Sequence, residues 1–166
     1  MQRYFLLTLF YFSMAMMNAQ PNSAASTAVE ATMSTYSFRL RPGQDLKQEL
    51  DILVQQKRIG AGAILSCVGS LTDVTLRLAN QDGSSKWHGH FEIVSLVGTL
   101  SVNGSHLHLS VADSTGRTLG GHLLEGCKIY TTAEIVVGIM PDITYTREID
   151  PTFGYRELVI LKRKRK

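Results

Sequence analysis

Two turn signals, each between short runs of alternating apolar residues, constrain the fold of this chain more than any other feature. Asn103-Gly104 predicts a two-residue hairpin loop of type I′. In the second turn, at residues 113–117, Gly116 suits the left-handed position of a three-residue loop with a bulge. The segment around these turns is therefore expected to form consecutive antiparallel strands.

The two turns also predict which residues lie opposite each other. The first turn sets Leu100 against Leu107, and the second sets Asp113 against Arg117, a pair of opposite charge. Because successive side chains of a strand point to opposite faces, both turns give the same core face. Its expected members are Leu100, Val102, Leu107, Leu109, Val111, Leu119 and Leu123.

The other face of these strands carries three histidines. The second turn places His108 directly opposite His122, and His106 lies diagonally from His122. Directly opposed Cβ atoms are about 4.5–5.5 Å apart and diagonal ones about 7–8 Å. Imidazole rings can close those gaps onto one ion, with bonds of about 2.0–2.1 Å. The alternative is three polar residues on a solvated face.

The residue types favour a particular ion. Three neutral imidazoles suit Zn²⁺ best, with Ni²⁺, Fe²⁺ and Co²⁺ as alternatives. Three protein ligands leave one position for water or substrate, which is typical of catalytic rather than structural zinc.

The rest of the pattern predicts one α+β domain. The chain has 166 residues, 44% hydrophobic and 19% charged, which fits one folded domain and argues against disorder. Asp45 is expected to cap a helix that ends near Lys57, with Gln48 completing a capping box. Mostly antiparallel strands around one helix make an α+β fold. We expect strands at 36–40, 62–68, 74–78, 91–102, 106–112, 117–124, 128–137 and 156–161.

The N-terminal region is predicted to be a leader followed by a linker. Arg3 precedes the apolar run 4–17, and Ala19 offers a small residue at a cleavage point, so 1–20 resembles a signal peptide. This favours the secretory pathway. An uncleaved anchor, an organellar extension, or a cytoplasmic or nuclear location are the alternatives. Residues 21–35 are rich in small and polar residues and predict a linker.

The C-terminal residues 162–166 form a basic tail. The net charge is +3 and this tail carries +5, so the remainder sums to 3 − 5 = −2. The tail is a candidate for binding nucleic acid or another polyanion, and a solvated tail that aids solubility is the alternative.

Two carboxylates and a second histidine pair are weaker candidates. Glu92 and Glu134 could act as acid, base or fourth ligand, or serve edge and ion-pair roles instead. The register puts Glu92 on the face opposite the histidines unless a bulge near Gly98 reverses it. His88 and His90 are expected to lie before their strand begins.

Other residues have simpler predictions. Cys67 and Cys127 are expected to be buried free thiols, since a disulfide scaffold of this length would have more cysteines. Asn103 begins a glycosylation sequon beside His106, where a glycan would crowd the site, and whether it carries one stays open.

An ordered set of motifs resembles the PPC (plants and prokaryotes conserved) domain, also called DUF296, over residues 36–161. The motifs are the segments 89–100, 106–109, 120–123, 132–136, 147–150 and 154–158. The resemblance implies a curved mixed sheet with a flanking helix, and a homotrimer. Bacterial and archaeal members of this type are similar in fold to acetolactate decarboxylase, a tri-histidine zinc enzyme, which supports a metal at the three histidines.

Two functions follow as hypotheses. The first is a metal-binding trimer with small-molecule chemistry at an open zinc site, where Arg147, Tyr155 and Arg156 would bind an anionic substrate or contact another subunit. The second is a non-enzymatic assembly module, DNA-associated like the plant members, although this chain lacks their Arg-Gly-Arg-Pro hook.

Overall fold

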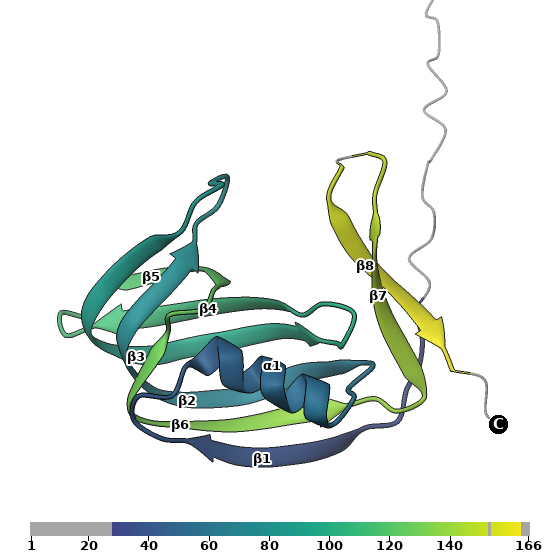
Figure 1. Ribbon diagram of the computed structural model, residues 1–166, viewed down its shortest axis with the longest axis horizontal. Coiled ribbons are helices and arrows are strands. Elements are labelled where there is room, and N and C mark those ends of the chain that lie inside the picture. Colours follow the sequence, from purple (N-terminus) through teal and green to yellow (C-terminus); the bar gives the residue numbers. More distant parts are fainter. Residues whose placement is uncertain (1–27, 153, 164–166) are drawn as a thin grey trace, which may run out of the picture.

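The computed structural model describes residues 28–152 and 154–163. The predicted leader at 1–20 lies outside the described residues, as do residues 164–166 of the tail. Within these two ranges, one helix and eight strands follow in the order shown in Figure 1. They are β1 Ser34–Leu40, α1 Leu46–Gln56, β2 Gly62–Arg77, β3 Ser85–Leu100, β4 His106–Asp113, β5 Thr118–Leu123, β6 Lys128–Ile139, β7 Ile143–Ile149 and β8 Arg156–Lys162.

Six strands form one curved sheet in the order β1-β6-β2-β3-β4-β5. β2 also pairs with β5, so strands β2 to β5 form a closed circuit. Each strand pairing among the described residues is antiparallel, as in the β7–β8 hairpin that stands beside the sheet (Figure 1). The predicted α+β class with a curved, mostly antiparallel sheet and one flanking helix is confirmed. The expectation of a mixed sheet is wrong for the described residues, because no pairing among them is parallel.

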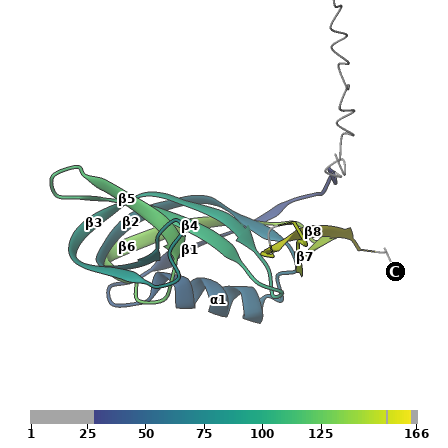
Figure 2. The same cartoon turned by 90° about the horizontal axis from the view of Figure 1, so that it is seen from above.

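The helix α1 begins directly after Asp45, as the predicted N-cap requires. The Asp45 side chain accepts hydrogen bonds from the backbone N–H groups of Lys47 and Gln48, which satisfies donors that a helix start leaves free. Leu46, Leu50 and Val54 are buried against the sheet, and α1 runs along one side of it (Figure 2). Among the described residues, no helix has the length and apolar character that a membrane crossing needs.

The predicted register of β4 and β5 is confirmed. Val111 lies opposite Leu119 and His108 opposite His122, and the Asp113 backbone N–H donates to the carbonyl of Arg117. The turn is held by the Asp113 carboxylate, which accepts from the N–H groups of residues 115 and 117. Gly116 has a φ of 82°, the left-handed conformation that this turn requires.

The predicted register of β3 and β4 is wrong by two residues. Leu107 lies opposite Gly98 rather than Leu100. The cause is the turn, because the Val102 N–H donates to the carbonyl of Ile59 in the loop after α1 instead of pairing across the hairpin. Val102 is consequently 37% exposed and is not part of the core. A shift of two residues keeps every side chain on its face, so the other assignments survive.

Three elements differ from expectation. The two strands predicted at 62–68 and 74–78 are one long strand, β2. His88 and His90 lie within β3 rather than before it. The strand β7 was not predicted, and it pairs with β8 to form the separate hairpin.

Candidate metal centre

Three imidazole rings converge on the outer face of β4 and β5. Nε2 of His106 lies 3.1 Å from Nε2 of His108 and 3.2 Å from Nδ1 of His122. One ligand nitrogen from each ring lies within 4.8 Å of the others. His106 and His122 stack nearly parallel, and His108 stands edge-on to both. This face is opposite to the buried Leu107 and Leu109.

These positions follow from local backbone contacts. His106 and His108 alternate with core leucines along β4, so both side chains point outward. His122 comes from β5, where it pairs with His108 on one side and with Arg77 of β2 on the other. The close approach of β5 to β2 needs Gly121, because a Cβ there would lie 2.7 Å from the carbonyl oxygen of Arg77.

The spacing of the nitrogens fits a bound ion. Two ligands at about 2.0–2.1 Å from a tetrahedral zinc stand roughly 3.3 Å apart, close to the separations of 3.1 and 3.2 Å measured from His106. A single Nε2 cannot donate a proton to two neighbours at once, whereas one cation between the rings satisfies three lone pairs.

Burial and neighbouring charge keep two of the imidazoles neutral. Burial lowers the pKa of His106, and the nearby Arg147 guanidinium lowers it further. Burial, followed by the charge of Arg77, also lowers the pKa of His122. A lowered pKa favours the unprotonated ring at neutral pH, which is the form that binds a metal.

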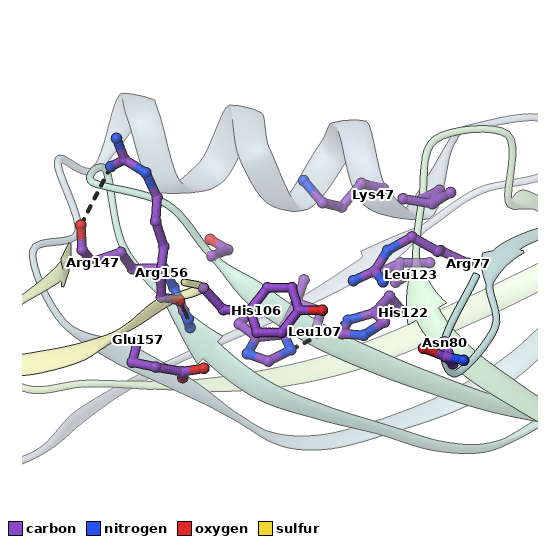
Figure 3. Close-up of a pocket in the computed structure, with 13 residues that line it drawn as sticks. Lys47, Arg77, Asn80, His106, Leu107, His122, Leu123, Arg147, Arg156 and Glu157 are labelled. Carbon is purple, nitrogen blue, oxygen red and sulfur yellow. Dashed lines mark hydrogen bonds between the residues drawn. The ribbon is translucent and has the colours of Figure 1, made fainter. Parts of the chain in front are cut away.

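Two cavities flank the histidines. The larger, of about 570 Å³, is lined by His106 and His122 and is drawn in Figure 3. The smaller, of about 210 Å³, is lined by His106 and His108. Arg147 and Glu157 line both cavities, so the β7–β8 hairpin contributes directly to the site. Small molecules thus have access to the rings from either side.

The structure does not bring the two predicted carboxylates to the histidines. The prediction that Glu92 lies on the face opposite the histidines is wrong. A bulge between Ile93 and Ser95, and not one near Gly98, brings Glu92 to the histidine face. Glu92 lies opposite Ala112, four residues along β4 from His108, a distance of roughly 13 Å at 3.3 Å per residue.

Glu134 lies still further across the sheet. It is exposed on β6, three strands from β4, which corresponds to roughly 14 Å at about 4.8 Å per strand. The carboxylate that the sequence did not single out is Glu157. The sequence analysis missed Glu157 because it did not predict the strand β7. Without β7, the β7–β8 hairpin that places Glu157 at the site could not be predicted either.

The cationic residues are better placed. Arg147, Tyr155 and Arg156 line the larger cavity, where an anion site was expected, and Lys47 and Arg77 join them. The sequence does not single out Lys47 or Arg77. Both reach the cavity only because α1 and β2 border it in the folded protein.

The predicted free thiols and the sequon also have defined positions. Cys67 and Cys127 are free, and Cys127 is fully buried whereas Cys67 is partly exposed. The side-chain amide of Asn103 donates to the carbonyl of Tyr145 at 2.9 Å, a bond that a glycan on that nitrogen would disrupt.

The ordered motifs, the curved sheet and the histidine cluster can be compared with known proteins. The family model of the Plants and Prokaryotes Conserved domain matches residues 27–141. The chain belongs to this family. A solved structure of a hypothetical protein from Salmonella cholerae-suis is 44% identical, with a TM-score of 0.80, and covers 82% of this chain and 99% of its own.

Other proteins similar to this chain are more distant or larger. A metal-containing protein from Archaeoglobus fulgidus is 22% identical with a TM-score of 0.70, covering 80% of this chain and 99% of its own, which shows the shared fold. A curated relative, the bifunctional protein GlmU of a Synechococcus strain, is 52% identical over 129 residues, or 78% of this chain. The chain spans only 20% of that relative's length.

Proposed function

We propose that this chain binds one divalent metal ion, with zinc as the first candidate, through His106, His108 and His122. A small molecule then binds at the position that these three ligands leave open. The observation that carries the proposal is the convergence of three ring nitrogens. The Nε2 of His106 lies 3.1 Å from the Nε2 of His108 and 3.2 Å from the Nδ1 of His122. A zinc ion held in this way would supply Lewis-acid chemistry to a water or carbonyl oxygen.

The proposal assigns the chain's own residues separate tasks. The three imidazoles hold the ion, and the lowered pKa values of His106 and His122 keep those two rings unprotonated and available for it. Glu157 lines both cavities beside His106 and is the carboxylate best placed to exchange protons with a bound molecule. Glu92 and Glu134, at roughly 13 and 14 Å by strand spacing, are weaker candidates for the same role.

The test is a metal analysis of the purified chain without chelators. We expect about one equivalent of zinc or another divalent metal, and a loss of that metal in His108→Ala and His122→Ala. His90→Ala is the matched control, since His90 is exposed on β3 and stacks on Tyr130 away from the cluster. Wild-type protein free of stoichiometric metal, or variants that retain it, would contradict the proposal.

A homotrimer is part of the same proposal. Val68, Val94 and Val97 are 57%, 57% and 52% exposed on the face of the sheet that α1 does not cover. Val97 lies opposite His108 and lines the smaller cavity, so this apolar surface continues into the metal site. Exposed apolar patches of this kind mark interaction surfaces, and the family resemblance favours further copies of this chain as the occupants.

The second candidate function is a non-enzymatic assembly module associated with nucleic acid. It is favoured by the five cations at 162–166. It is also favoured by the similarity to the AT-hook motif nuclear-localized protein 6 of Arabidopsis thaliana, which is 31% identical over 112 residues. Arg163 weakens this candidate, because its side chain donates to the hydroxyl of Thr144. DNA binding that falls steeply with salt and disappears when 162–166 are deleted would support it. DNA binding that survives the deletion would show that the tail is not the DNA-binding segment.

A further inference from the structure

We propose that the larger cavity is an anion site, which binds a small organic carboxylate or a phosphate group through Arg77, Arg147 and Arg156. This rests on the proposed function only in placing the anion beside the metal ligands. The chemical class follows from the charges, bonds and size of the cavity.

The cavity carries an excess of positive charge. Its lining includes Lys47 and the three arginines, against a single acidic residue, Glu157. Lys47 forms an ion pair with Asp51 on its own helix. None of the three arginines forms an ion pair within residues 28–152 and 154–163. A guanidinium presents a planar fork of donors that matches carboxylate and phosphate oxygens, so three without an acidic partner favour a bound anion.

Arg147 is held in place with donors to spare. One of its terminal nitrogens donates to the hydroxyl of Thr99 at 3.2 Å and the other to the carbonyl of Arg156 at 3.4 Å. Arg156 donates in return to the carbonyl of Arg147 at 3.3 Å. The Nε of Arg147 is buried and has no hydrogen-bond partner among the described residues. Buried donors are nearly always satisfied, so this one calls for an acceptor.

The arginines lie on both sides of the metal ligands. Arg77 of β2 lies opposite His122 of β5 in the strand pairing. The Arg147 side chain donates a hydrogen bond to Thr99 of β3, and Thr99 lies opposite His106 of β4. In Figure 3, Arg77 lies beside His122, while Arg147 and Arg156 lie on the other side of His106. An anion held between the arginines would therefore lie next to the imidazoles of His106 and His122.

The size of the cavity favours a small molecule over a polymer. Its volume of about 570 Å³ falls within the roughly 300–1,000 Å³ typical of small-molecule sites. Asn80 and Tyr155 on its wall offer further polar groups to the uncharged part of a ligand. A nucleic acid, by contrast, would contact an extended basic surface and not one concave cluster.

The experiment is calorimetric titration of the full chain with succinate, inorganic phosphate and the neutral analogue succinamide. We expect at least one anion to bind, succinamide not to bind, and the affinity to fall at least tenfold in Arg147→Met and in Arg77→Met. Arg117→Met is the control, since Arg117 is exposed in the β4–β5 turn, away from this cavity. Comparing succinate with phosphate identifies which kind of anionic group the site prefers.

Two further measurements keep the outcomes distinct. Arg156→Met removes an exposed side chain, so it tests the site even if Arg147→Met does not fold. Titrating His108→Ala with the same anions separates the metal proposal from the anion proposal. Anion binding to this variant supports the anion site whether or not the metal is lost. Equal binding of succinamide, no binding of either anion, or affinities unchanged in Arg77→Met and Arg156→Met would overturn the inference even in a metal-loaded protein.

Discussion

The thiol of Cys127 is buried in the core and forms hydrogen bonds with the backbone of a neighbouring strand. Its sulfur donates to the carbonyl of Thr75 at 3.4 Å and accepts from the N–H of the same residue at 3.3 Å. Burial raises the pKa of Cys127 to about 11 and that of Cys67 to about 12. Both groups are therefore protonated, and poor nucleophiles, in the folded protein at neutral pH.

The raised pKa of Cys127 predicts a loss of stability in alkali. The unfolded thiol loses its proton near pH 9, its ordinary value, whereas the folded thiol keeps it until about pH 11. The contribution is fully present below pH 9 and falls between pH 9 and 11 by about 1.4 kcal/mol per pH unit. Urea unfolding at several pH values should show a steeper slope in the wild type than in Cys127→Ala, in which Cys67 still contributes through its own raised pKa. Identical slopes would contradict the assignment.

At the scale of elements, the contact between β3 and β4 determines where His106 points. Gly98 has a φ of 139°, and a Cβ there would lie 1.9 Å from the carbonyl oxygen of His106. The two strands reach this separation only because position 98 has no side chain. The backbone of His106, the first of the three proposed metal ligands, is therefore fixed by a glycine on the neighbouring strand.

Gly98→Ala should consequently disturb both stability and metal binding. The new methyl group has to push β3 and β4 apart, and the backbone conformation is unfavourable for alanine, so we expect a loss of at least about 2 kcal/mol in unfolding free energy. Metal affinity should fall in the same variant. Gly83→Ala is the control, because a Cβ at that loop position meets nothing within 4 Å, and it should unfold like the wild type. Equal stability of the two variants would contradict this explanation.

For the whole molecule, the closed circuit of β2 to β5 leaves one face covered by α1 and the other open. The open face carries the three clustered histidines together with the exposed valines. Self-association through that face would place the site close to a neighbouring copy. The oligomeric state and the site are thus expected to depend on each other.

Val68→Asp combined with Val94→Asp should convert an oligomer to a monomer. Both side chains are 57% exposed, so the change should leave the folded chain intact while adding charges that oppose an apolar contact. Light scattering after size exclusion gives the mass. Ile52→Asp is the matched control, since Ile52 is 46% exposed on α1 and should leave the mass unchanged. An unaltered oligomer in the double variant would rule out this face.

The sequence alone determined the helix, the β4–β5 turn and hence the shared face of the three histidines. Each of these depends on contacts between residues close in the chain, such as the Asp45 cap and the glycine of the 113–117 turn. The histidine face also survived an error in the β3–β4 register, because that error was an even number of residues.

Only the tertiary structure decided what surrounds the histidines. The bulge in β3 that moves Glu92 depends on how the strand bends, and the turn at Val102 depends on a carbonyl of the distant Ile59. The cavity needs Arg77 from β2 and Arg147 from β7, whose meeting requires the closed sheet and the hairpin at once. Contacts between segments so far apart are set by packing, which no local pattern of residues encodes.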